Sequence, residues 1–262
     1  MQYLEIKIHE NVATLLLDRP QRHGALSPRL LEDLRQALRD IHQEKRVRSV
    51  IVTARGEHFS SGVDLHTFHE ISQLPEREQW EQWFQYWRQL AETCEEMLRF
   101  PKPLIAAVDG AAIGAGLAIA LSCDLMLATD RSSFSAGAVR RGLAGGITTA
   151  LLAFRVGTAV AAKMSLSGLT MDASQMDAAG LLADRPAPVD QIWVTATKWA
   201  KDCAVGSPEA VAATKRMLNE TIGEALLSQV ASAAADSATL CTTESAAEGI
   251  SAFLDRRTPV WP

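Results

Sequence analysis

The stretch PKPLIAAVDGAAIGAGLAIALSCDLMLA, residues 101–128, is the part of the chain around which the other segments can be arranged. It begins with two prolines on either side of Lys102, which favour extended backbone and prevent a helix from continuing through them. The five apolar residues 104–108 are too few for a helix and predict a strand buried on both faces. Three glycines follow, and the apolar residues 117–121 after them predict the start of a helix.

A strand, a glycine-rich turn and the start of a helix direct free backbone N–H groups toward one point, where negative charge is stabilised. The turn around Gly110, Gly114 and Gly116 therefore predicts a site for an anion or an oxyanion. The alternative is a tight connection that needs glycine only for close packing. The order of the glycines is the reverse of the dinucleotide-binding fingerprint, and Ala115 stands where a nucleophile elbow would have serine.

Length and composition restrict the remaining possibilities. The chain has 262 residues, of which 47% are hydrophobic and 22% charged, as in soluble globular proteins with a substantial core. Its net charge of −5 argues against nucleic acid as the main partner. No signal peptide and no membrane-spanning apolar run is recognisable. Four cysteines without a C-x-x-C pair favour reduced thiols and a cytoplasmic location over a zinc site or a disulfide framework.

The first third of the chain alternates between strand and helix patterns. Residues 3–9 and 12–18 predict two strands joined by a short turn, which makes a hairpin. Residues 27–42 predict an amphipathic helix with Ser27 as its N-cap, and residues 48–54 predict the next strand.

A long helix is predicted over residues 76–99, and it carries most of the aromatic side chains of the protein. Trp80, Phe84 and Trp87 share one face at helical spacing. Such a stripe is more often core than a ligand-binding wall, so we interpret it as core packing.

The middle of the chain continues the alternation. Residues 123–129 and 132–136 predict strands, and residues 147–167 predict a helix. Residues 172–182 predict a further helix with a capped start, which ends at Gly180.

From about residue 189 the chain is rich in alanine and helical, with a break at residues 206–208. The RPAP run before it predicts a boundary between an α/β core, residues 1–188, and a C-terminal helical trimerisation region, residues 189–262. Apolar residues of this region predict contact with other copies of the chain, namely Leu226, Leu227, Val230 and Leu240.

Seven motifs, in this order and spacing, resemble those of the crotonase superfamily, the enoyl-CoA hydratase/isomerase family, along nearly the whole chain. They are RPQRHGAL (19–26), HFSSGVDL (58–65), PKPLIAAVDGAAIGAG (101–116), SCDLMLA (122–128), the region around Phe134 and Gly142, MDASQMDAAGL (171–181) and EGISAFLDRR (248–257). The resemblance implies an α/β fold, a spiral of ββα units, with a helical C-terminal region that builds homotrimers or dimers of trimers. It implies an acyl-CoA substrate, with coenzyme A as part of the substrate and no separate cofactor, and neither nucleic acid nor membrane as a partner.

The resemblance also assigns an oxyanion hole to two backbone N–H groups, those of Val63 and Ala115. A thioester carbonyl becomes an enolate during reaction, and donors placed where that charge develops stabilise it. Gly62, Asp64 and Gly114 flank the donors and are expected to lie beside the substrate, with Asp64 orienting its turn.

The chain departs from the family at the acid–base groups. Family hydratases use two glutamates, and the matching positions here are Ala118 and Ala138, which cannot transfer a proton. Hydration needs a base for the water and an acid for the α-carbon, and family isomerases rely on the second carboxylate, so both activities lose support. His66 is a candidate replacement base. With His69 it supplies only two possible metal ligands, so no metal site is expected.

Four arginines are candidates for anionic parts of a substrate. The resemblance makes Arg22 and Arg256 the candidates for the coenzyme A phosphates. Arg140, together with Arg141, could bind a substrate carboxylate in bidentate fashion. The alternative for all of them is an ordinary solvated surface position.

In this family the region after the first oxyanion segment covers the acyl chain. The helix predicted over residues 76–99 occupies that place here. Trp80 and Trp87 are therefore expected to border the acyl group.

Three functions remain open. The favoured one is an acyl-CoA-handling enzyme of the enoyl-CoA hydratase/isomerase family whose reaction is not standard hydration. The second is an enzyme that uses only the oxyanion hole, such as a decarboxylase or a thioester hydrolase. The third is a protein that keeps the fold and the trimer without catalysis and serves for binding or assembly. Binding of acyl-CoA without turnover would favour the third.

Overall fold

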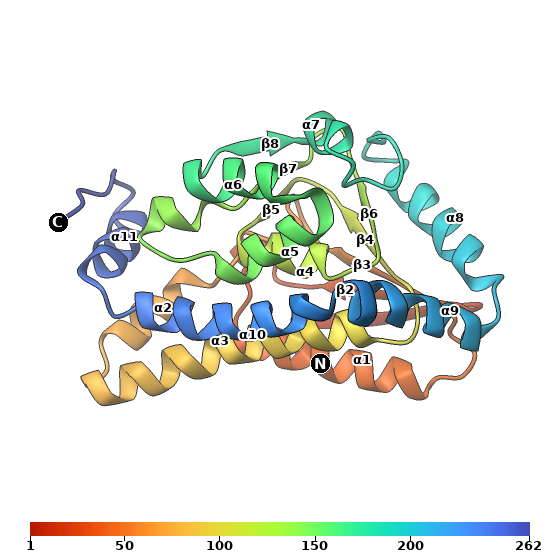
Figure 1. Cartoon of the computed structure of the whole chain (residues 1–262), viewed down its shortest axis with the longest axis horizontal. Helices are drawn as coiled ribbons and strands as arrows, with labels where there is room; N and C mark the ends of the chain where they lie inside the picture. Colours follow the sequence, from red (N-terminus) through yellow and green to blue (C-terminus); the bar gives the residue numbers. More distant parts are fainter.

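The large sheet of the computed structural model has five strands in the order β1-β2-β3-β4-β6. Figure 1 labels β2, β3, β4 and β6 of this sheet. The structure describes residues 1–262, apart from the side chain of Ile222. β1 and β2 pair antiparallel and the other neighbours pair parallel, which confirms the predicted hairpin and the buried strand of the glycine-rich stretch. The strands are β1 (Leu4–His9), β2 (Val12–Leu17), β3 (Ser49–Ala54), β4 (Leu104–Val108) and β6 (Leu125–Ala128).

A second sheet of three short strands has the order β5-β7-β8. Two isolated backbone bridges, Leu26 with Val63 and Ser60 with Ala112, extend it toward the N-terminal part of the chain. Successive passes of the chain thus add one strand to the large sheet and one strand or bridge to the small one, which is the predicted spiral. The sequence did not predict β5 and β8, because three residues are too few for an alternating pattern. The strands are β5 (Ala111–Ile113), β7 (Ser133–Ser135) and β8 (Thr170–Asp172).

The helices of the first half follow the predicted pattern closely. The first helix begins where predicted because Ser27 Oγ accepts a hydrogen bond from the backbone N–H of Leu30 at 3.3 Å. A short helix after the first glycine turn was not predicted, and Asp64 caps it by accepting a hydrogen bond from the N–H of His66. The four helices are α1 (Pro28–Gln43), α2 (Leu65–Ser72), α3 (Glu76–Arg99) and α4 (Ala115–Leu121).

The aromatic stripe on α3 is only partly buried. Trp83 and Trp87 are buried, and the ring of Phe68 from α2 lies edge-on to Trp83 with 4.7 Å between centroids. Trp80 and Phe84 are 46% and 43% exposed and pack on each other. The interpretation as core is therefore wrong for these two residues. They lie in the first turns of α3, which extend beyond the elements that cover its C-terminal part (Figure 1).

The predicted helix over residues 147–167 is two helices, because Gly157 between them adopts a φ of +83°. The following helix has the predicted cap, in which the Asp172 carboxylate and the Gln175 side chain bond each other's backbone N–H groups. The helices of this part are the 3₁₀ helix η2 (Gly137–Arg141), α5 (Gly146–Val156), α6 (Thr158–Ser167) and α7 (Ala173–Ala178). A further 3₁₀ helix, η1 (Pro20–Arg22), lies between β2 and α1.

The C-terminal region is helical, as predicted, and it packs on the rest of the chain. One of its helices covers the face of the large sheet opposite α1, where Ala196 and Ala200 contact Ile51, Ile105 and Leu127. None of the described helices has both the length and the apolar character needed to cross a membrane. The elements are α8 (Ile192–Ala204), α9 (Pro208–Arg216), the π-helix η3 (Met217–Ile222), α10 (Glu224–Leu240) and α11 (Glu244–Leu254).

The apolar stripe of α10 is covered within the same chain. Leu226 and Val230 are buried in the main core, where α10 packs on α3 and α5. The expectation that these residues need another copy of the chain is therefore wrong for both, whereas Leu240 is 41% exposed. The division of the chain after residue 188 stays a prediction.

A buried ion pair fastens the C-terminal region to the glycine-rich stretch. The Lys215 ammonium of α9 lies 2.7 Å from the carboxylate of Asp124 and also donates to the carbonyl oxygen of Met97. Asp124 accepts a second hydrogen bond from the N–H of Leu104 at the start of β4. Removing one partner of such a pair would leave the other charge buried and uncompensated, so both sides of the contact depend on each other.

Two glycines allow α11 to dock directly on the backbone after η2. A Cβ on Gly249 would lie 2.0 Å from the carbonyl oxygen of Arg141, and a Cβ on Gly142 would lie 2.1 Å from that of Ser245. Both distances are far below contact distance, so no larger residue fits at either position without displacing the helix.

We predict that Gly249→Ala destabilises the protein, although alanine is normally the better residue inside a helix. The added methyl group must push α11 from η2, at a cost of about 1–3 kcal/mol, or a fall in Tm of several degrees. Thermal unfolding measures this. Ala247→Gly, on the exposed side of the same helix, is the control and should cost only about 1 kcal/mol. A rise in Tm for Gly249→Ala would contradict the direct docking.

Candidate functional site

A cavity of about 930 Å³ opens where the two glycine turns, η1, η2 and α11 meet. Most of the predicted site residues lie on its wall, although they come from segments far apart in the sequence. Those that line it are Arg22, Gly62, Val63, Asp64, His66, Trp87, Gly114, Ala115, Ala138, Arg140, Arg141 and Arg256.

The first turn is held by backbone contacts around Gly62, whose φ is +93°. Its carbonyl oxygen accepts a hydrogen bond from the N–H of Leu26 at 2.8 Å, and its own N–H donates to Ser60 Oγ at 3.2 Å. The Ser60 hydroxyl in turn donates to the carbonyl oxygen of Gly24 at 2.7 Å. These contacts fix the peptide that carries the N–H of Val63.

Asp64 has a structural role beside this turn. Its carboxylate is 4% exposed, lies 2.9 Å from the Arg19 guanidinium and caps α2 at the N–H of His66. Arg19 also donates to the carbonyl oxygen of Ala25 at 2.6 Å. The carboxylate is thus occupied by partners and orients the turn, as its position in the motif predicts.

The second turn is built around Gly114, with a φ of +52°. Its N–H donates to the carbonyl oxygen of Ser135 at 2.8 Å, and its carbonyl oxygen accepts from Thr148 Oγ1 at 3.0 Å. Ala115 is the first residue of α4, so its N–H has no acceptor within the helix. Because its backbone is helical, alanine can stand there without strain.

Ser60 brings the two turns together. Its N–H donates to the carbonyl oxygen of Ala111, and its carbonyl oxygen accepts from the N–H of Ile113, both at 2.9 Å. A Cβ on Gly116 would lie 2.5 Å from Cβ of Ser60, so only glycine permits this approach. In the described part of the chain, neither Val63 nor Ala115 donates its N–H to another protein group.

The two alanines at the predicted glutamate positions have different surroundings. Ala138, in η2, lines the cavity. Ala118 is fully buried in α4 and belongs to the main core. Among the described lining residues the one carboxylate is Asp64, which Arg19 already holds.

The two predicted tryptophans are separated. Trp87 lines the cavity, and its Nε1–H donates to Sγ of Cys241 at 3.2 Å. Burial raises the pKa of that thiol to about 12, so it is the neutral form that accepts the bond at neutral pH. Trp80 lies on the exposed outer part of α3 instead. An α-helix turns by 100° per residue, so the spacing of seven places both rings on one face but does not determine what covers each.

Two pairs of residues that line the cavity were not singled out from the sequence. His23 and His58 lie with 5.3 Å between ring centroids, and His58 Nδ1 accepts a hydrogen bond from the N–H of Ala111 at 3.3 Å. Both histidines stand inside motifs quoted for the family resemblance, and this position in the sequence could have indicated that they lie near the site. Phe253 and Leu254 also stand inside a quoted motif, but they reach the cavity only because α11 folds back over η2.

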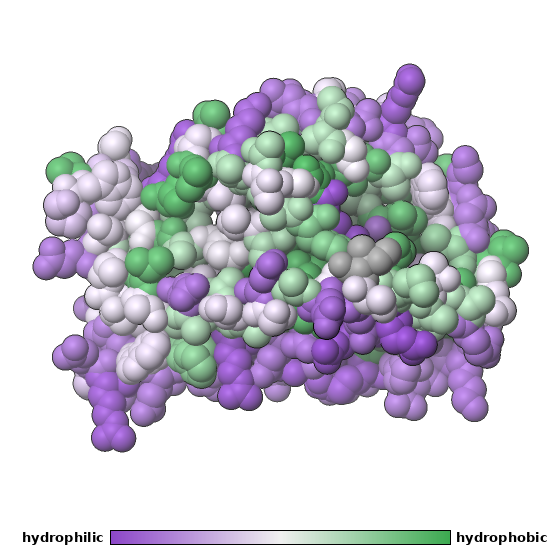
Figure 2. Space-filling view, viewed as in Figure 1, coloured by the Kyte–Doolittle hydropathy of each residue, from purple (hydrophilic) through white to green (hydrophobic). Residues whose placement is uncertain are grey.

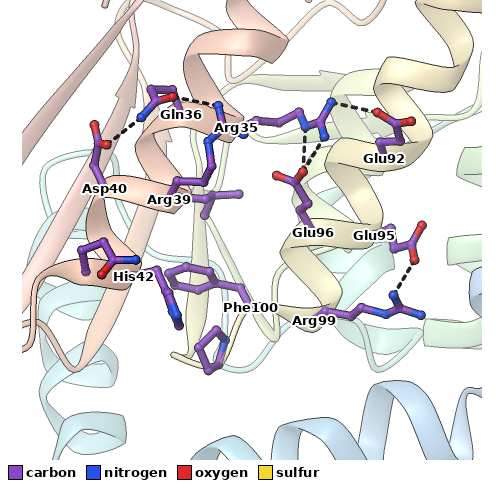
Figure 3. A pocket seen from close by; sticks show the side chains of 13 residues that line it. Arg35, Gln36, Arg39, Asp40, His42, Glu92, Glu95, Glu96, Arg99 and Phe100 are labelled. Carbon is purple, nitrogen blue, oxygen red and sulfur yellow. Dashed lines mark hydrogen bonds and ion pairs between the residues drawn. The ribbon is translucent and has the colours of Figure 1, made fainter.

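A second cavity of about 680 Å³ lies between α1 and the C-terminal half of α3 (Figure 3). Two of the arginines that line it form ion pairs with glutamates. The Arg35 guanidinium reaches across from α1 to Glu92 and Glu96 of α3, and Arg99 pairs with Glu95 at 2.8 Å. The hydrogen bond to Glu96 raises the pKa of Arg35. Because Arg35 and Arg99 are held by glutamates and Arg39 has only the amide oxygen of Gln36 as its partner, the groove has, among its described lining residues, one arginine without a carboxylate partner.

Solved structures identify the class of protein to which this fold and cavity belong. An enoyl-CoA hydratase from Mycobacterium avium superposes with a TM-score of 0.85 at 27% identity, covering 98% of both chains. An enoyl-CoA hydratase/isomerase from Pseudoalteromonas atlantica superposes with a TM-score of 0.86 at 26% identity, covering 99% of this chain and 100% of the other. The architecture is the crotonase fold, and the kind of protein is an acyl-CoA-binding enzyme.

Sequence comparison leads to the same family. A 2,3-dehydroadipyl-CoA hydratase from Escherichia coli is 34% identical over 262 residues, which covers 99% of this chain and 98% of that protein. The family model described as enoyl-CoA hydratase/isomerase matches residues 7–262. The chain therefore belongs to the enoyl-CoA hydratase/isomerase family, as the seven motifs predict.

We predict that an acyl-CoA entering the cavity changes the fluorescence of Trp87 and not that of Trp80. The first indole lines the cavity, so a ligand there changes its surroundings, whereas the second lies outside the cavity. Titration with butyryl-CoA should give an emission change that Trp87→Phe largely removes and Trp80→Phe retains. If Trp80→Phe removes the change instead, the acyl-CoA binds elsewhere.

Proposed function

We propose that this protein binds an acyl-CoA thioester with its carbonyl oxygen between the backbone N–H groups of Val63 and Ala115. The observation that carries the proposal is that both groups lie on one cavity and donate to no other described protein atom. They are also close together, because a Cβ on Gly62 would lie 3.6 Å from the nitrogen of Ala115. Two such donors stabilise the negative charge that the thioester oxygen gains when an enolate forms, by about 3 kcal/mol each.

We also propose that this protein hydrates enoyl-CoA thioesters only slowly. The cavity wall at Ala138 carries a methyl group, the position at Ala118 is enclosed in the core, and the Asp64 carboxylate is bound to Arg19. Each missing acid or base removes a contribution of roughly 10²–10⁴-fold to the rate. His66 lies on α2 at the cavity and is the candidate for a proton-transferring group.

A second candidate function uses the donors without a glutamate. In decarboxylation of a thioester that carries a carboxylate next to the α-carbon, the C–C bond breaks, carbon dioxide leaves and the electron pair forms the enolate. No base has to remove a proton in that step. The absence of a free carboxylate among the described lining residues, together with several arginines there, favours this candidate over hydration.

We expect Ala115→Pro to lower turnover about 100- to 1,000-fold, because it removes one donor N–H. Proline is tolerated at the first position of a helix, so α4 should form. The measurement is turnover over a panel of enoyl-, 3-oxoacyl- and malonyl-CoA thioesters, with thermal unfolding as a check of folding. Ala115→Gly keeps the N–H and is the matched control. Unchanged turnover in a folded Ala115→Pro protein would exclude the proposed oxyanion hole.

Crotonyl-CoA hydration by the natural chain should be far below the typical enzyme turnover of about 10 s⁻¹. Ala138→Glu alone should gain little, because the acid and the base act as a unit. Ala118→Glu with Ala138→Glu should gain at least about 100-fold, at the cost of a lower Tm, since the first glutamate enters an enclosed position. Wild-type turnover near the typical value would show that another group supplies the base.

We also propose that the chain assembles into trimers, through the face that carries α5, α6 and α10. Figure 2 shows white and green surface over these helices, whereas the edge over α1 and α3 is mostly hydrophilic. Light scattering at micromolar concentration should give three or six times the chain mass of 28.4 kDa, and a monomer would refute the assembly. Exposed apolar side chains near this face are Leu166, Met217, Leu218 and Leu240.

A further inference from the structure

The wall of the cavity that contains η2 carries positive charge that the protein itself does not neutralise. Arg140 and Arg141, the last two residues of η2, both line the cavity. We name these two residues the arginine pair. Asp64 is the one carboxylate among the described lining residues, and Arg19 compensates it at 2.9 Å.

The arginine pair is held in place by neutral groups. Arg140 Nε donates to the carbonyl oxygen of Ser167 at 3.0 Å, and the Arg141 guanidinium lies 5.0 Å from the ring centroid of Phe253. Both contacts leave the terminal nitrogens of the guanidinium groups able to donate to an anion. Arg131, by contrast, has a carboxylate partner, because it pairs with Asp109 at 2.6 Å.

The arginine pair also lies near the proposed thioester site. η2 starts two residues after Ser135, whose carbonyl oxygen accepts the N–H of Gly114 beside the second donor. A 3₁₀ helix rises about 2 Å per residue, so the backbone of Arg141 is about 6 Å along its axis from Ala138. An arginine side chain easily spans the remaining distance into the cavity. Arg22, by contrast, belongs to η1.

We propose that the arginine pair binds a carboxylate on the acyl group of the thioester, so that the substrate class is a dicarboxylic acyl-CoA. The inference rests on the proposed function. A guanidinium matches a carboxylate with two parallel hydrogen bonds, and a planar fork fixed by Ser167 or Phe253 is already oriented for this. A neutral acyl chain of the same length would leave the charges without a partner.

The test compares thioesters that differ only in the acyl end. Dissociation constants of the full chain are measured by calorimetry for adipyl-CoA against hexanoyl-CoA and for malonyl-CoA against butyryl-CoA. We expect at least one carboxylated member to bind about tenfold to a hundredfold tighter than its neutral partner. A preference for adipyl-CoA over hexanoyl-CoA would place the bound carboxylate far from the α-carbon. A preference for malonyl-CoA over butyryl-CoA would place it next to the α-carbon.

Variants assign the preference to residues. Arg140→Gln and Arg141→Gln should reduce the ratio of the dissociation constants of the neutral and the carboxylated thioester to near one, with the change in the binding of the carboxylated thioester. Arg141→Lys should retain part of the preference. Arg22→Gln is the matched control. It should weaken carboxylated and neutral thioesters alike, because the family resemblance makes Arg22 a candidate for the coenzyme A phosphates, which all of these thioesters share.

Two results would overturn the inference. One is equal binding of carboxylated and neutral thioesters by the natural chain. The other is a loss for every thioester and for free coenzyme A in the variants of the arginine pair, which would assign these residues to the phosphates. A failure of the proposed function gives a different result, namely that neither kind of thioester binds to the chain.

Discussion

The site depends on the close approach of two backbone turns at Ser60. The N–H and carbonyl oxygen of this residue pair with Ala111 and Ile113, and its hydroxyl bonds Gly24, so three segments meet at one residue. Gly116 must lack a side chain for this contact to form. Since backbone hydrogen bonds have narrow length ranges, and the side chain that helps them is the short, buried Ser60, the N–H groups on the two turns are placed relative to each other without a long flexible side chain.

The rest of the fold supports this contact from outside. The spiral adds strands to both sheets at each pass, which places the glycine turns at neighbouring positions of the small sheet. The ion pair of Asp124 and Lys215 fastens the C-terminal region to the stretch that carries the second turn. α11 then closes one side of the cavity, because glycines at its docking point let it approach η2.

The groups proposed to bind the thioester oxygen and the groups that transfer protons in the family differ in what holds them in place. The proposed donors belong to the backbone of the two turns, whereas proton transfer depends on single side chains that can be replaced without affecting the turns. Alanines stand at the positions that the family resemblance assigns to the two glutamates, and Arg140 and Arg141 of η2 line the cavity beside Ala138. If the proposed function is correct, the site favours reactions in which an anionic substrate brings its own leaving group or charge, and it disfavours the addition of water.

The sequence by itself determined the hairpin, the long helices, the capped starts at Ser27 and Asp172, and the glycine turns, because caps, turns and periodic patterns act over a few residues. It also carried enough ordered motifs to predict the family. The tertiary structure alone decided that Trp87 lines the cavity while Trp80 does not, and that α11 contributes Phe253 to the wall. These outcomes depend on which distant element covers a given helix face. Burial is decided by the whole fold, whereas the hydrogen bonds that cap α1 and α7 join residues only three positions apart.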